Sequence, residues 1–168
     1  QGHQLVVQLG VGLLRRLQHA LGDDVGDLER EQDAGQRREQ LGDILHRRCR
    51  HVVTENKRVM AAVDALKGQD LAQMGHLLNE CQASLRDDFE ISCDEIESLV
   101  SLANACPGVL GSRMVGGGFG GCVLSLTTSD DVDAVTTQLA ADYNASFGSE
   151  PWMHVVEAAD PVKEVNRQ

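Results

Sequence analysis

The sequence contains a run of five glycines in six positions, Gly116-Gly117-Gly118-Phe119-Gly120-Gly121, which limits the possible folds more than any other stretch. Glycine loses more backbone freedom on folding than any other residue, so a plain turn would not need so many of them. The run suits a backbone that another group must approach closely, such as phosphates or a second glycine-rich loop. A flexible hairpin connection is the simpler alternative.

The glycine run also contains the string G-x-G-x-x-G, which is part of a dinucleotide-binding fingerprint. That fingerprint requires a helix directly after the loop, because the helix N-terminus receives the pyrophosphate. Here the loop is followed by Cys122–Leu126, an apolar segment typical of a buried strand. The context therefore argues against a dinucleotide-binding domain.

The chain around the loop predicts helices first and strands later. Apolar spacing and cap residues predict helices over Ile44–Lys67, from Asp70 to Leu85, and from a Ser92/Glu95 capping box to Ala103. They are followed by a strand, the glycine loop, a second strand, a helix after Asp131 that Gly148 closes, and a last strand: Val109–Val115, Cys122–Leu126 and Trp152–Val156. Strands joined by so short a loop should be antiparallel. We expect an α+β fold with helices packed on a small antiparallel sheet.

Residues 1–40 differ from the rest of the chain. The first 50 residues contain no Lys, Ser, Thr, Asn, Pro, Met, Phe, Tyr or Trp, so they carry few turn, cap or core signals. Leu5–Leu21 has leucines at helical spacing, and Asp23–Gln40 is polar with scattered glycines. We predict an amphipathic helix followed by a linker, and treat 1–40 as a linker or a segment of doubtful origin.

The charge and cysteine patterns exclude several functional classes. Twenty-six acidic residues against 15 basic ones leave a net charge of −11, which disfavours nucleic acid and anionic membranes as partners. There is no signal-peptide pattern and no apolar run long enough to span a bilayer. The five cysteines form no C-x-x-C pair, and His51, His76 and His154 share no ligand spacing. We expect a soluble, cytoplasmic protein with reduced thiols and no metal site of its own.

Three longer stretches carry a resemblance: Ser112–Cys122 (SRMVGGGFGGC), Cys49–Val59 and Asn79–Cys93. The first is similar to the third motif of the galactokinase family of the GHMP small-molecule kinases, and the second to a helix of that family's C-terminal half. The third is similar to the family's N-E-S-H-x-S-L-R-D-x-Y-E-V-S-C stretch. All three are in family order from about residue 41 onward. The resemblance implies that 41–168 is a GHMP kinase C-terminal domain with a ferredoxin-like fold.

The resemblance also implies a function: phosphorylation of galactose by ATP with Mg²⁺, giving galactose 1-phosphate. The family's sugar motif (G-E-H-T-D-Y), phosphate loop and catalytic Asp and Arg belong to an N-terminal kinase half, and this sequence contains none of them. We therefore assign no catalytic residue or metal ligand here and expect the chain alone to be inactive. By resemblance, the nucleotide site would be supported by Gly116, Gly117, Gly118, Phe119, Gly120 and Gly121.

Ser84 and Arg86 are candidates for the substrate cleft, because a charged loop between two helices can face a polyanion. The alternative is an exposed charge cluster in which Arg86 pairs with an aspartate. Gln82 stands where the family has His, and we assign it no role. Two functional questions stay open: whether the sugar is galactose or N-acetylgalactosamine, and whether the fold is instead a non-catalytic ferredoxin-like ligand-binding or regulatory module.

Overall fold

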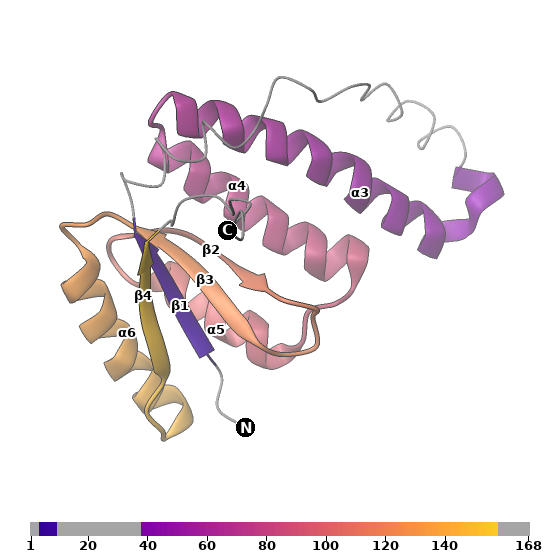
Figure 1. Cartoon of the computed structure of the whole chain (residues 1–168). Helices are drawn as coiled ribbons and strands as arrows, with labels where there is room; N and C mark the ends of the chain where they lie inside the picture. Colours follow the sequence, from indigo (N-terminus) through magenta and orange to yellow (C-terminus); the bar gives the residue numbers. More distant parts are fainter. Residues whose placement is uncertain (1–3, 10–37, 158–168) are drawn as a thin grey trace, which may run out of the picture.

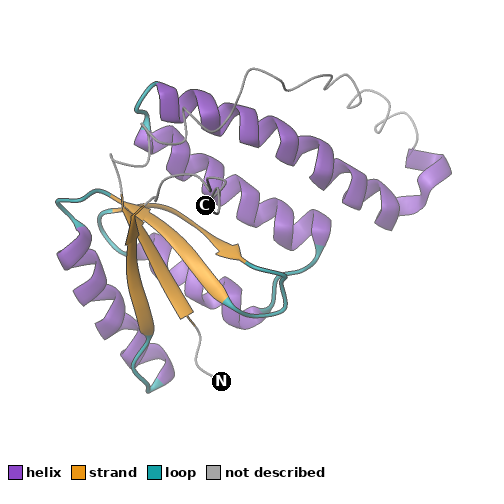
Figure 2. Ribbon diagram, in the orientation of Figure 1, coloured by secondary structure: helices purple, strands orange, loops and turns teal. Residues whose placement is uncertain are grey.

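A computed structural model describes residues 4–9 and 38–157 of the chain (Figure 1). Figure 2 shows helices stacked along one side of a twisted sheet and a further helix on its opposite side. The elements in chain order are β1 (Gln4–Leu9), α3 (Arg38–Lys67), α4 (Leu71–Ser84), the π-helical turn η1 (Leu85–Phe89), α5 (Asp94–Ala105), β2 (Val109–Val115), β3 (Cys122–Thr127), α6 (Val132–Phe147) and β4 (Trp152–Glu157).

The four strands form one sheet in the order β2-β3-β1-β4. β2 and β3 are antiparallel, with Met114 opposite Val123, which confirms the prediction for the two strands that the glycine loop joins. β1 is parallel to both β3 and β4, so the whole sheet is mixed and its antiparallel part is the β2–β3 pair. The unit β3-α6-β4 is a split β-α-β arrangement with β1 inserted between its strands.

The predicted helix at Leu5–Leu21 is wrong for its first residues, because Gln4–Leu9 is a strand. Leu5, Val6 and Val7 pair with residues of β3 on one side and of β4 on the other. β-Branched residues favour strands when neighbouring strands are there to pack against, and helical spacing of leucines does not reveal those neighbours. Residues 10–37, which include the rest of that helix and most of the predicted linker, lie outside the described residues.

The main core lies between the sheet and helices α5 and α6. Its side chains come from both helices and from β2 and β3, and those with at most 1% exposure include Ile96, Leu99, Met114, Val123, Val135 and Leu139. Burying such side chains contributes about 1.5–3 kcal/mol each. The apolar segments that predicted β2 and β3 therefore form strands with side chains buried against helices.

Helix α4 covers the outer edge of β2. Gly75 of α4 lies against the backbone of Leu110 and Gly111, and no larger residue would fit there. The side-chain oxygens of Asn79 and Gln82 accept hydrogen bonds from the backbone N–H groups of Ser112 and Met114, at 2.9 and 2.8 Å. A helix thus satisfies strand groups that would otherwise be an open edge. α3 then packs on the outer side of α4 (Figure 1).

Two of the predicted helix ends are confirmed and one is wrong. Asp70 Oδ1 accepts from the N–H of Gln73 at 2.9 Å, and Gly148 ends α6 in the left-handed region at φ 66°. Ser92, however, is not the cap of α5, because Cys93 occupies that position and Ser92 Oγ donates to Glu97 instead. No helix of residues 38–157 combines the length and the apolar character needed to cross a membrane.

Candidate functional site

The glycine loop connects β2 to β3 and has an unusual backbone. Gly116, Gly118, Gly120 and Gly121 have φ between 92° and 136°, and Phe119 lies in the left-handed region at φ 57°. Residues with a Cβ rarely adopt such angles, so the glycines are required by the path of the chain. The path of this loop therefore depends on its glycines.

The inner side of the loop is anchored to the segment after η1. The N–H of Phe119 donates to the carbonyl oxygen of Ile91 at 2.7 Å. A Cβ on Gly118 would lie 2.7 Å from both Cβ and O of Ile91, closer than real side chains come. The loop is thus held by one backbone hydrogen bond and by a contact that only glycine permits.

The outer side of the loop is open. A Cβ on Gly116, Gly117 or Gly120 would meet no heavy atom within 4 Å, and the Phe119 side chain is 75% exposed. A bare backbone with room around it can be approached closely by an anion or by another loop. The loop therefore offers space and backbone rather than an acid or a base.

The segment predicted as a charged loop is a π-helical turn instead. The N–H of Glu90 donates to the carbonyl of Leu85, five residues earlier, and Glu90 then takes a left-handed conformation. Leu85 is buried and Phe89 packs against the core, so apolar residues fix both ends of the turn. π-Helical turns occur frequently at functional sites. This one places Ile91 under the glycine loop.

Of the two cleft candidates, Ser84 directly precedes this turn and Arg86 lies within it. Ser84 is 6% exposed, and its hydroxyl lies 3.0 Å from Nδ1 of His51 and donates to Oδ2 of Asp88 at 3.2 Å. Arg86 is exposed and pairs with Asp87 and Glu97 at 2.7 and 3.3 Å. The structure thus gives both side chains partners within η1 and the flanking helices. The charged neighbours of Arg86 are those expected for an exposed charge cluster, which was the alternative to a place in the substrate cleft.

Basic residues of α3 bind the same turn. Arg47 and Arg48 pair with the carboxylate of Glu90 at 2.5 and 2.6 Å, and Arg50 pairs with Asp88. The hydrogen bond to Asp88 raises the pKa of Arg50. The His51 ring stacks on Phe89 with centroids 4.6 Å apart. Salt bridges at the surface contribute little each, but this set fixes η1 against α3 at several points.

Burial lowers the pKa of His51 below its usual 6.5, although Glu55 and Asp88 oppose the shift. The unfolded chain therefore binds a proton at this site more readily than the folded chain does. We expect the free energy of unfolding to fall as the pH drops below roughly 6.5, and to be independent of this group above it.

Urea unfolding between pH 5 and 8 measures this effect, and His51→Gln is the matched variant. The variant should lose part of the acid-side decrease. An identical pH profile in both proteins would contradict a neutral, buried His51.

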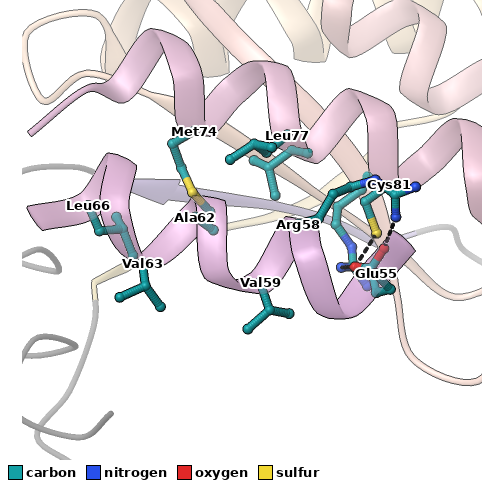
Figure 3. Close-up of a pocket in the computed structure, with 11 residues that line it drawn as sticks. Glu55, Arg58, Val59, Ala62, Val63, Leu66, Met74, Leu77 and Cys81 are labelled. Atoms are coloured by element: carbon teal, nitrogen blue, oxygen red, sulfur yellow. Dashed lines mark hydrogen bonds and ion pairs between the residues drawn. The ribbon is translucent and has the colours of Figure 1, made fainter. Parts of the chain in front are cut away.

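An apolar groove of about 210 Å³ lies between α3 and α4 (Figure 3). Its walls are aliphatic side chains, and at one end Glu55 accepts hydrogen bonds from Arg58 and from the Cys81 thiol. Burial, followed by the bond to Glu55, raises the pKa of Cys81 to about 12. A thiol with that pKa stays protonated at neutral pH and is not a nucleophile.

The thiols and acids of the described residues form no further reactive cluster. None of the five cysteines forms a disulfide. Within residues 4–9 and 38–157, no three His, Cys, Asp or Glu side chains gather where a metal ion could bind. We therefore take the glycine loop as the candidate functional site.

Comparison with known proteins identifies the fold that holds this loop. Residues 60–145, just over half of the chain, match the family model described as "GHMP kinases C terminal". The chain belongs to this family. The match spans α4, η1, α5, both strands of the hairpin and most of α6, and so includes the loop and its anchor.

The relatives of this GHMP kinase domain are galactokinases. The galactokinase of Clostridium acetobutylicum is 44% identical over 133 residues, which are 76% of this chain and 34% of that protein. The galactokinase of Glaesserella parasuis is 41% identical over 128 residues, 76% of this chain and 33% of that protein. The chain spans about a third of the length of these curated relatives.

A solved structure agrees with the sequence comparison. The galactokinase of Lactococcus lactis, complexed with galactose, superposes with a TM-score of 0.65 at 36% identity. The superposition covers 82% of this chain and 36% of that chain. The α+β fold expected from the three motifs is confirmed.

Sequence reasoning missed Ile91, which accepts a hydrogen bond from the loop, and Gln82, which binds the end of β2. Ile91 is an ordinary apolar residue in the sequence, and Gln82 was given no role because it departs from the family pattern. The only available signal was their position within Asn79–Cys93, the same motif that carries Ser84 and Arg86.

Proposed function

We propose that residues 41–168 are the C-terminal domain of a galactokinase-type enzyme, which transfers a phosphoryl group from ATP to the anomeric hydroxyl of galactose. The observation that carries the proposal is the 44% identity to a galactokinase over 133 residues. That similarity is supported by a glycine loop whose backbone geometry only glycines permit. Under this proposal, Gln4–Leu9 contributes β1 to the sheet of the domain, and the remaining residues of 1–40 are a linker or lie outside it.

The glycine loop supports the nucleotide site in this proposal. Phosphoryl transfer depends on positioning and on neutralising charge, and the required Mg²⁺ neutralises the phosphates of ATP when it is bound. The open backbone at Gly116, Gly117 and Gly120 fits a role beside those phosphates or beside the loop that binds them. The catalytic acid and base and the metal ligands would come from the N-terminal kinase half.

The substrate and compartment follow the same reasoning. The relative solved in complex with galactose supports galactose rather than its N-acetylated form as the sugar. Five cysteines without a disulfide support a reducing compartment, and so a cytoplasmic enzyme. The partners are then small molecules and the kinase half, with no nucleic acid or membrane.

A chimera tests the proposal. The 168-residue chain, which includes β1, replaces the matching C-terminal part of the C. acetobutylicum galactokinase, and ADP release is measured with and without galactose. We expect galactose-dependent turnover from the chimera and none above the no-sugar blank from the 168-residue chain alone. N-acetylgalactosamine as the second sugar separates the two substrates.

A folded but inactive chimera would contradict the proposal and favour the non-catalytic ligand-binding or regulatory module. The unmodified C. acetobutylicum enzyme is the positive control. Circular dichroism and size-exclusion chromatography establish that the chimera has folded.

A further inference from the structure

The buried amide of Gln82 joins three parts of the fold that surround the glycine loop. The side chain lies on the last turn of α4, and the residue is only 3% exposed. Its Oε1 accepts a hydrogen bond from the N–H of Met114 at 2.8 Å. Its Nε2 donates to Oε1 of Glu97 at 2.6 Å and lies 3.3 Å from Oγ of Ser92.

The residues that Gln82 binds in β2 and in the segment after η1 are close in sequence to the glycine loop or to its anchor, Ile91. Met114 is the second-last residue of β2, and the loop begins at Gly116. Ser92 follows Ile91, whose carbonyl accepts from Phe119 at the middle of the loop. One amide therefore binds both the strand that leads into the loop and the segment that anchors the loop from below.

Glu97 completes the arrangement. Its Oε1 accepts from Ser92 Oγ at 2.6 Å as well as from Gln82, and its Oε2 lies 3.3 Å from Nη1 of Arg86. The Gln82 amide has one acceptor oxygen and two donor hydrogens, so this one side chain can bind Met114, Glu97 and Ser92 together. If that residue were apolar, Met114 N–H would lose its partner in a buried place.

We propose that Gln82 is the positioning residue of the glycine loop, because it holds the β2 stem and the Ile91 anchor at a constant separation. The expected effect of Gln82 on ATP binding rests on the proposed function, whereas its expected effect on the loop does not. Gln82 is not a catalytic residue, since no reacting group is argued to touch it.

Asn79 provides a matched control one turn earlier on α4. Its side-chain oxygen accepts from the N–H of Ser112 at 2.9 Å and from Asn104 at 3.0 Å. It thus covers the same strand edge as Gln82 but binds neither Ser92 nor Glu97. Gln82→Met and Asn79→Leu each remove an amide and keep a side chain of similar shape.

The first test uses the 168-residue chain and native-state amide hydrogen exchange by NMR. Gln82→Met should speed exchange at Met114 and Phe119 by about tenfold or more. Asn79→Leu should speed exchange at Ser112 and leave Phe119 unchanged. Equal exchange at Phe119 in the wild type and in Gln82→Met would overturn the proposal, as would a Phe119 response equally large in Asn79→Leu.

Two further variants keep the test decisive if Gln82→Met does not fold. Gln82→Glu keeps an acceptor for the N–H of Met114 but places a carboxylate beside Glu97. It should therefore speed amide exchange at Phe119 more than at Met114. Gln82→His retains one acceptor and one donor in its neutral form and should restore slow exchange. Fast exchange at Phe119 in Gln82→His would contradict the proposal, and so would exchange at Phe119 that stays at the wild-type rate in Gln82→Glu.

The second test uses the galactokinase chimera. Gln82→Met should raise the KM for ATP by about fivefold or more, with the KM for galactose within about twofold, and Gln82→His should reverse the change. An inactive wild-type chimera would remove the proposed function and leave the exchange result standing. An active chimera whose ATP KM does not respond to Gln82→Met would overturn the positioning role alone.

Discussion

Gly118→Val in the galactokinase chimera should lower kcat/KM for ATP by about tenfold or more, which corresponds to about 1.4 kcal/mol of lost positioning. Gly118 has φ 92°, and its Cβ would lie 2.7 Å from Cβ and O of Ile91. A β-branched side chain there is strained and also pushes the loop off its anchor. The KM for galactose should change much less, because the sugar motif belongs to the other half.

Initial rates against ATP at saturating galactose measure the effect, and the thermal midpoint of each variant separates it from unfolding. His154→Ala is the activity control, since His154 is exposed on β4 and outside the site. Gly117→Ala is the stability control, because a Cβ there meets no atom within 4 Å. If Gly118→Val stays folded with unchanged ATP kinetics, the loop is only a turn.

Gly75→Ala should cost the isolated chain about 3 kcal/mol or more of its free energy of unfolding. The new Cβ would lie 2.2 Å from the carbonyl oxygen of Leu110 and 2.5 Å from its carbonyl carbon, both backbone atoms of β2. Backbone in a paired strand cannot move aside as a flexible side chain can. The loss is large even though alanine favours helices over glycine by about 1 kcal/mol.

Urea unfolding followed by circular dichroism measures the Gly75→Ala effect. Gly68→Ala is the control: it follows α3, its Cβ would lie no closer than 3.3 Å to Asp64 O, and its cost should stay under about 1 kcal/mol. Equal stability of Gly75→Ala and the wild type would mean that α4 does not lie against β2.

The elements predicted well are those whose signals are local. Helix α3 ends at Lys67, Asp70 caps α4, Val109–Val115 is a strand, and Gly148 ends α6, all as expected. Each depends on apolar spacing or on a residue with a special backbone or capping role, which neighbouring residues in the sequence suffice to specify.

The errors occur where a distant partner decides the outcome. Leu5–Leu9 is a strand because β3 and β4 flank it. Ser92 binds Glu97 instead of capping α5, because the side chain of Gln82 contacts both residues. The π-helical form of Leu85–Phe89 similarly depends on packing and on the arginines of α3. None of these partners lies within one helical turn in the sequence.

The glycine loop between two antiparallel strands could be predicted from the residues alone, and so could the family, from three motifs. Backbone conformation at glycine is a local property, so the loop could be recognised without the fold. The contacts around the loop emerge only from the folded chain: Ile91 is 28 residues from Phe119, and Gln82 is 32 residues from Met114. Contacts between such distant positions depend on how α4 packs on β2, and hydrogen bonds across that interface leave no periodic pattern in the sequence.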